Sequence, residues 1–195
     1  MRFLYTLGLF YVALCGALLW RGREVVAPPS PPVRPPHQTE VEPAGTGAGW
    51  FQRMKPYCNS VEVETQLRYQ PPPGGREGSG YAAACLALAG KIDKARERIV
   101  ALPESDRVAA VGIVFAVGHP VADAGDDRSA GPIMELVVEF WPNHYMALYH
   151  AGASEFILGQ GDLARKNLEA FLENYHENDG WQSSALEMLH KLGAR

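Results

Sequence analysis

One spacing of small and apolar residues recurs in the C-terminal two thirds of this chain. In residues 83–102, and again in residues 152–171, successive positions are separated by steps of seven, five, four and three. The two series are Ala83, Gly90, Ala95, Ile99 and Leu102, and Gly152, Gly159, Ala164, Leu168 and Phe171. Such a repeated spacing is typical of stacked helix-turn-helix units, which usually bind other molecules rather than catalyse reactions. It predicts an all-α fold and a binding function.

The stretch between these two series matches them only in its second half. Gly112 is followed, after an insertion, by Ala130, Met134, Val137 and Pro142, which keep the steps of four and three. We interpret this stretch as a helix pair whose turn is lengthened by a loop over residues 118–127. A loop of this length inside a compact repeat is a place where specific contacts are often found.

The repeated spacing has a physical reason. Two antiparallel helices approach closely where a small residue lies on each facing surface, as Gly152 and Ala164 would. Gly90 and Gly159 lie where the first helix of a pair must end, because glycine adopts the left-handed conformation without steric cost. Each pair leaves an apolar face that the next pair covers. An amphipathic helix over residues 181–192 is expected to cap the last pair.

The arrangement resembles the tetratricopeptide repeat (TPR) family, whose helix pairs recur about every 34 residues. The resemblance spans residues 76–178. The chain departs from the family at the early tryptophan, which is Val108 in the second unit and Leu148 in the third. The late proline is replaced by His176 in the third unit.

The resemblance implies a concave groove, lined by the first helix of each pair, that binds a protein partner. The residues that it assigns to this groove are apolar: Ile113, Val117, Tyr149, Ala153, Phe156 and Ile157. An amphipathic helix or an extended apolar segment would suit such a groove. Alternatively, the chain's own residues 61–69, which are predicted to be helical, fill it.

The N-terminus has the pattern of a membrane anchor. Residues 3–20 carry no charge and are flanked by Arg2, Arg21 and Arg23. At helical rise this run spans roughly 27 Å, just enough for the hydrocarbon core of a bilayer. We predict an uncleaved single-pass transmembrane helix over residues 1–23, with a cleaved signal peptide as the alternative. The very short N-terminal tail favours a periplasmic or other extracytoplasmic location for the rest of the chain.

A proline-rich linker is predicted over residues 24–46, before a TPR-like domain over residues 47–195. Seven prolines occur between residues 28 and 43, with too few apolar residues for a core, so this segment is interpreted as an extended spacer. The net charge of -4 gives no electrostatic reason to expect nucleic acid as a partner.

Three cysteines are present, and Cys15 lies in the apolar N-terminal run. The other two, Cys58 and Cys85, leave two interpretations open. In an oxidising compartment they would form a disulfide that ties the segment before the repeats to the first repeat helix. Otherwise they are two reduced cysteines buried as small apolar residues.

The predicted loop over residues 118–127 is the candidate for chemistry. It contains His119, Asp123, Asp126 and Asp127, and imidazoles with carboxylates can bind a transition metal or perform acid–base catalysis. No cysteine pair or second close histidine supports a metal site, and the spacing matches no metal motif. Asp126 or Asp127 is well placed to cap the following helix. We therefore predict neither a metal nor a catalytic residue here.

Together these features predict a membrane-anchored adaptor or scaffold that mediates protein–protein interaction outside the cytoplasm. We predict that the chain is not an enzyme and needs no cofactor. Two alternatives remain: a structural subunit of a larger membrane complex, and a metal-dependent hydrolase that uses residues 119–127.

Overall fold

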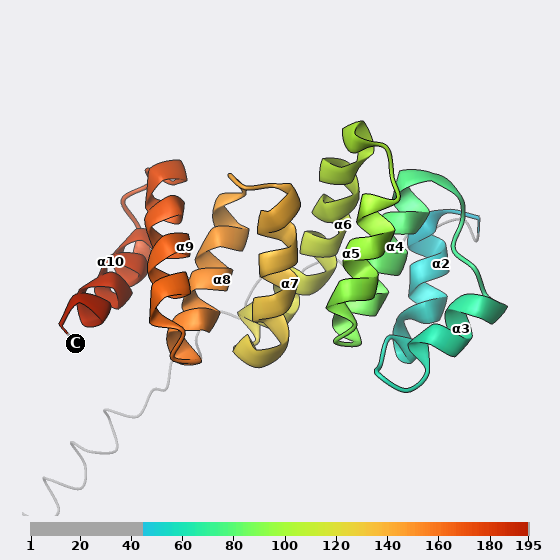
Figure 1. Ribbon diagram of the computed structural model, residues 1–195, viewed down its shortest axis with the longest axis horizontal. Helices are drawn as coiled ribbons and strands as arrows, with labels where there is room; N and C mark the ends of the chain where they lie inside the picture. The colour runs from blue at the N-terminus through green and yellow to red at the C-terminus, as the bar shows by residue number, and fades with distance from the viewer. Residues whose placement is uncertain (1–44, 195) are drawn as a thin grey trace, which may run out of the picture. The chain divides into compact units, whose positions relative to one another are not determined.

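The computed structural model describes residues 45–194, which are all-helical and contain no strand (Figure 1). The predicted all-α class is confirmed for this part of the chain. Its elements are α2 (Gly47–Met54), the 3-10 helix η1 (Lys55–Tyr57), α3 (Val63–Tyr69), α4 (Gly75–Leu88), α5 (Ile92–Val100), α6 (Glu104–Asp123), α7 (Asp127–Phe140), α8 (Tyr145–Ile157), α9 (Gly161–Asn174) and α10 (Gly180–Gly193).

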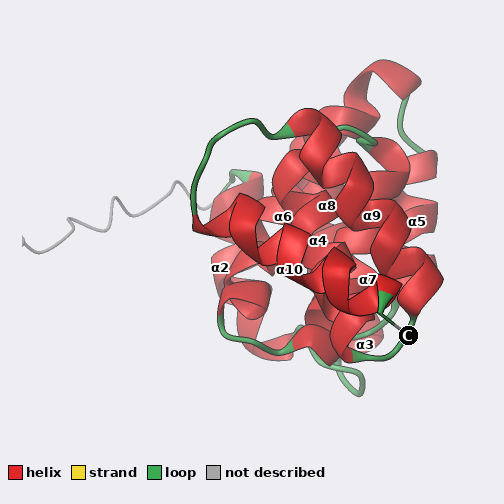
Figure 2. Ribbon diagram, turned by 90° about the vertical axis from the view of Figure 1, so that its left-hand side faces the viewer, coloured by secondary structure: helices red, strands yellow, loops and turns green. Residues whose placement is uncertain are grey.

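Three antiparallel helix pairs, α4–α5, α6–α7 and α8–α9, follow one another along the stack. The first helix of one pair packs against the first helix of the next, as α4 does with α6, or against the second helix of the preceding pair, as α8 does with α7. Viewed along the stack, the second helices α5, α7 and α9 lie to one side of α4, α6 and α8 (Figure 2). The described residues are therefore compatible with a two-layered helical repeat.

The middle pair is a regular copy, and the prediction of an inserted loop over residues 118–127 is wrong. Helix α6 continues through Asp123, and the chain turns at Gly125, whose φ is 76°. The equivalent turn glycines, Gly90 and Gly159, have φ of 71° and 78°. Counted from Gly118, the middle series has the same steps of seven, five, four and three as the others: Gly118, Gly125, Ala130, Met134 and Val137.

The first helices of the last two pairs need glycine at the crossing. A Cβ on Gly152 would lie 2.7 Å from Cγ of Leu168, and one on Gly118 would lie 2.6 Å from Cγ2 of Ile133. Gly112, which the sequence interpretation placed at this position of the middle pair, has no such close neighbour. Gly118 is therefore the contact residue, and it keeps α6 close to α7.

Substituting Gly152 by alanine is expected to lower the free energy of unfolding by about 1–2 kcal/mol. The overpacking against Leu168 costs more than alanine gains in helix propensity. Gly180→Ala is the matched control, because no atom lies within 4 Å of a Cβ at that helix end. Urea unfolding followed by far-UV circular dichroism would measure both. A Gly152→Ala variant as stable as the parent would contradict the close crossing.

Short helices close the stack at its N-terminal end. Helix α2 packs on α4 through stacked rings of Phe51 and Tyr81, whose centroids are 5.2 Å apart. Asn59 Oδ1 accepts hydrogen bonds from the backbone N–H groups of Val61 and Glu62, just before α3. A disulfide between Cys58 and Cys85 joins the end of η1 to α4. Of the two interpretations of these cysteines, the structure has the disulfide.

Helix α10 covers the C-terminal end of the stack. Asp179 caps it by accepting hydrogen bonds from the backbone N–H groups of Trp181 and Gln182. Ala185 and Met188 are buried with the apolar residues of α8 and α9. The predicted helix over residues 181–192 is therefore present and packs on the last pair.

The predicted anchor over residues 1–23, and all of the predicted linker except residues 45 and 46, lie outside the described residues. Within residues 45–194, no helix combines the length and the apolar character needed to cross a membrane.

Candidate functional site

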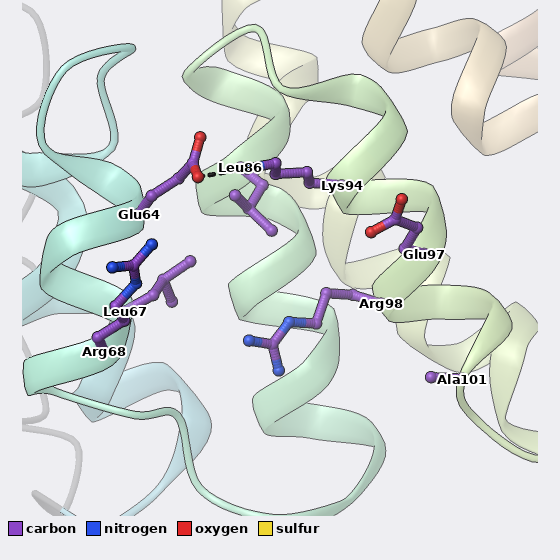
Figure 3. Close-up of a pocket in the computed structure, with 8 residues that line it drawn as sticks. All are labelled: Glu64, Leu67, Arg68, Leu86, Lys94, Glu97, Arg98 and Ala101. Carbon is purple, nitrogen blue, oxygen red and sulfur yellow. Dashed lines mark hydrogen bonds and ion pairs between the residues drawn. The ribbon is translucent and has the colours of Figure 1, made fainter.

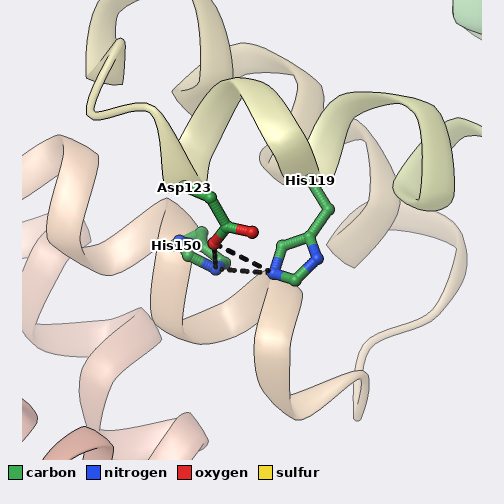
Figure 4. Close-up of side chains that lie close together, drawn as sticks. All are labelled: His119, Asp123 and His150. Carbon is green, nitrogen blue, oxygen red and sulfur yellow. Dashed lines mark hydrogen bonds and ion pairs between the residues drawn. The ribbon is translucent and has the colours of Figure 1, made fainter. Parts of the chain in front are cut away.

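Three ligand-type side chains converge between α6 and α8. His119 and Asp123 lie one helical turn apart on α6, and His150 faces them from α8 (Figure 4). The two Nε2 atoms of the histidines are 3.0 Å apart. Oδ1 of Asp123 lies 3.5 Å from Nε2 of His119 and 3.8 Å from Nε2 of His150. We call these three residues the His–Asp–His cluster.

The cluster lies at the boundary between the core and the surface. His150 is only 7% exposed, and its ring contacts Trp181 of α10 edge-on at 5.7 Å between centroids. The ring of Phe115 stacks on His119 at 4.8 Å. Asp123 is 52% exposed. Aromatic rings therefore wall the cluster on the protein side, and the carboxylate side is open.

Burial governs the protonation of the innermost residue. It lowers the pKa of His150 to about 4, with the nearby charge of His119 lowering it further and Asp123 raising it. At neutral pH the imidazole of His150 is therefore uncharged, and one ring nitrogen offers a lone pair. The neighbouring His144 has another role, because its Nδ1 accepts a hydrogen bond from the backbone N–H of Ala147 and so caps α8.

The structure divides the four predicted loop residues. His119 and Asp123 belong to the cluster. Asp126 caps α7 by accepting a hydrogen bond from the backbone N–H of Ser129 at 3.2 Å, as expected for one of these acids. Asp127 is the first residue of α7, and its backbone carbonyl accepts a hydrogen bond from Ser154.

The sequence interpretation assigned His150 to packing or a contact surface, and its statement that no second histidine lies close to His119 is wrong in space. His150 is 31 residues away in sequence, on a different helix. The signal that could have found it is the repeat itself. Once Gly118 is aligned with Gly152, His119 and Asp123 fall on the first helix of one pair and His150 on the first helix of the next.

The six residues assigned to an apolar groove do not form one open surface. Ile113 packs against Gly80 of α4, and Val117 packs on the core between the pairs. Tyr149 is only 8% exposed, and its hydroxyl hydrogen-bonds to Ser184 of α10. Ala153 and Phe156 are partly buried, whereas Ile157 is 63% exposed. Of the six positions, only Tyr149 is buried; four are half-buried between helices and Ile157 is exposed, so their role in binding a partner stays a prediction.

Residues 61–69 do not fill such a groove either. Helix α3 packs on α4 at the N-terminal end of the stack, and its contacts do not extend along α6 and α8 as a groove occupant's would. It borders instead a cavity of about 520 Å³ with α4 and α5.

This α3–α5 cavity combines an apolar floor with charged walls (Figure 3). Leu67 of α3 and Leu86 of α4 are buried at its floor. Glu64 forms ion pairs with Lys91 and Lys94, and its hydrogen bond with Lys94 is the main cause that lowers the pKa of its carboxyl group.

Two arginines on opposite walls of the α3–α5 cavity are not neutralised. Arg68 on α3 and Arg98 on α5 form no hydrogen bond or ion pair with any residue of the described part of the chain. Figure 3 shows both guanidinium groups directed into the space between the two helices. Glu97 of α5, whose carboxylate forms no ion pair within the described residues, and Ala101, the residue after α5, complete the lining. The cavity therefore offers apolar contact together with two unpaired guanidinium groups and the carboxylate of Glu97.

These features define an all-helical protein of stacked helix pairs, with a His–Asp–His cluster and a basic, apolar-floored cavity. Comparison of the chain with protein-family models, with curated proteins and with solved structures finds no match.

Proposed function

We propose that this chain is a membrane-anchored, TPR-like adaptor that holds a partner protein outside the cytoplasm. The α3–α5 cavity carries this proposal. We prefer it to the groove expected from the sequence, in which Tyr149 is buried and four of the other five residues are half-buried. The regular spacing of 35 and 34 residues between the equivalent positions Ala83, Gly118 and Gly152 supports the resemblance to TPR proteins.

The cavity suits a partner segment in which an apolar side chain lies close to carboxylates. The apolar side chain would pack on Leu67 and Leu86, and the carboxylates would pair with Arg68 and Arg98. Arginine favours this role because its planar guanidinium group can bind a carboxylate through two parallel hydrogen bonds. Glu64 does not compete for these arginines, because Lys91 and Lys94 already pair with it.

The Cys58–Cys85 disulfide supports an extracytoplasmic location. Disulfides persist in oxidising compartments and are rare in the cytosol. This location agrees with the apolar run of residues 3–20 and the very short tail before it.

A C-terminal fusion to a reporter enzyme that is active only outside the cytoplasm is expected to be active.

Reversing both cavity charges in the full chain, with Arg68→Glu and Arg98→Glu, is expected to abolish recovery of the partner after in-cell crosslinking. The new carboxylates would repel the acidic segment, and the complex of the parent should weaken with rising salt. The matched control is Arg128→Glu with Arg165→Glu, which changes the net charge equally at positions outside the cavity.

Quantitative mass spectrometry of the recovered proteins would measure the effect. Equal recovery with the cavity variant and the control variant would contradict the cavity as the binding site. Recovery that depends only on residues 3–20, tested by exchanging them for an unrelated anchor, would instead favour a structural subunit of a membrane complex.

A further inference from the structure

We propose that His119, Asp123 and His150 form a binding site for one divalent transition-metal ion of the zinc type. The site lies between α6 and α8 and is separate from the α3–α5 cavity. It is independent of the adaptor proposal, because no residue of the cluster borders that cavity.

The distances within the cluster fit three ligands around one ion. The ligand atoms are separated by 3.0, 3.5 and 3.8 Å. A tetrahedral zinc ion with bonds of about 2.0–2.1 Å has neighbouring ligand atoms ~3.4 Å apart. The observed separations lie on both sides of this value. Small movements of the three side chains would therefore let all three ligand atoms bind one ion.

The donor atoms select the class of metal. Two imidazole nitrogens and one carboxylate oxygen suit zinc, iron(II), cobalt(II), nickel(II) or copper(II). Magnesium and calcium prefer oxygen ligands throughout, and the cluster supplies only one carboxylate. Three protein ligands leave a further position for water or for an exogenous ligand, on the open side beside Asp123.

The stacking of helix pairs does not itself require these side chains. At the equivalent place between α4 and α6, the repeat puts Ala84, Leu88 and Ala116 where the cluster has His119, Asp123 and His150. The same fold is therefore made there with apolar residues. The junction between α6 and α8 instead brings three ligand-type groups together, although burying the imidazole of His150 at 7% exposure costs desolvation.

The chain already provides the rigidity that a metal site needs. His119 and Asp123 are four residues apart on one helix, so they face the same side. Phe115 stacks on His119, and Trp181 contacts His150, which limits the movement of both rings. Bound metal would add a link between α6 and α8, which belong to different pairs.

The test uses the full chain without an affinity tag that binds metal, purified in detergent and stripped with a chelator. Zinc is titrated against a chromophoric competitor, and bound metal is counted by elemental analysis. We expect one zinc ion per chain. Cobalt(II), as a spectroscopic substitute, should give the intense visible absorption of a four-coordinate ion.

Two variants at the less buried ligands test the assignment without disturbing the core. Asp123→Asn and His119→Gln should each weaken zinc binding at least ~100-fold, because even loss of groups that only orient a ligand costs 10–100-fold. Asp126→Asn and His176→Gln are the controls, since neither residue belongs to the cluster, and both should bind zinc like the parent. Far-UV circular dichroism checks that all four variants are folded.

Three results would overturn the proposal. The first is that the parent chain binds less than one zinc ion per chain even when the zinc concentration is well above the protein concentration. The second is unchanged binding in folded Asp123→Asn and His119→Gln variants. The third is loss of binding in His176→Gln, which would place the metal elsewhere. Failure of the adaptor test with Arg68 and Arg98 would leave all three readouts unaffected.

Discussion

Replacing Cys58 and Cys85 together by alanine is expected to lower the free energy of unfolding by about 3–4 kcal/mol. The disulfide closes a loop with a sequence separation of 27. Closing a loop of this size lowers the entropy of the unfolded chain, which raises its free energy by about 3.5 kcal/mol at 25 °C. It also ties η1 to α4, so its loss should release α2 and α3 first. Urea unfolding, with hydrogen exchange to locate the loosened helices, would measure both effects.

The effect of a reductant provides the control. Dithiothreitol should lower the stability of the parent towards that of the double alanine variant and leave the variant itself unchanged. Exchange should quicken in α2 and α3 but not in α9 and α10, which pack at the other end of the stack. A double variant within about 1 kcal/mol of the parent would contradict a stabilising disulfide.

The stability of the chain should depend on pH through Glu155. This side chain is 1% exposed and accepts two hydrogen bonds from Asn167 Nδ2, at 2.8 and 2.9 Å. Burial is the largest cause that raises its pKa to about 7; Glu135 raises it further, whereas Asn167 and Lys166 lower it. Between pH 4.5 and 7, Glu155 therefore keeps a proton in the folded chain that it has released in the unfolded chain, where its carboxyl pKa is near 4.5.

The sign follows from this difference. The contribution of Glu155 to stability is complete below pH 4.5 and is lost as the pH rises through 7, by about 3 kcal/mol in total. Glu155→Gln keeps the shape and an acceptor for Asn167 but cannot ionise. The variant should match the parent near pH 4.5 and exceed its stability by about 2–3 kcal/mol at pH 8. Unfolding of both chains in urea across this pH range would measure the difference.

Glu173→Gln on the exposed side of α9 is the control, and it should leave the pH dependence of the parent intact. If Glu155→Gln retained the full pH dependence, another group would be responsible. If it were less stable than the parent at pH 8, the ionised carboxylate would be stabilising and the burial argument would be wrong.

The sequence predicted the all-helical class because its small residues mark crossings and turns directly. Gly90 and Gly159 turn the chain with positive φ, and Gly152 makes the expected close contact with Leu168. The same rule applied to the middle pair failed because Gly112 was chosen in place of Gly118. A Gly-His-Pro segment looks unfavourable for a helix, but Pro120 removes only one backbone N–H donor, and packing around Gly118 keeps α6 continuous.

Helix α2 was also not predicted. Its eight residues begin with the small residues Gly47, Ala48 and Gly49, which carry little helical signal. Packing decides its structure: Trp50, Phe51 and Met54 are buried, and the indole N–H of Trp50 donates to the carbonyl of Gln70. Such tertiary contacts override weak local propensity.

Only part of each candidate site was within reach of the sequence. His119 and Asp123 share a helix turn and were identified, whereas His150 approaches from another helix and depends on the alignment of the pairs. Among the groove positions, Tyr149 is covered by α10, a contact that repeat spacing does not specify. The α3–α5 cavity depends on where the short α3 docks, which single-sequence patterns do not contain.

The most direct test of the adaptor proposal is site-specific photo-crosslinking of the full chain in the cell that makes it. A photoreactive residue replaces Ala101 at the edge of the α3–α5 cavity, Ala116 on the exposed face of α6, or Glu173 on α9. The proposal predicts one partner crosslinked from position 101 alone, through a peptide that contains carboxylates beside an apolar residue. Crosslinking from position 116 or 173 but not from 101, or no crosslinked protein from any position, would contradict it.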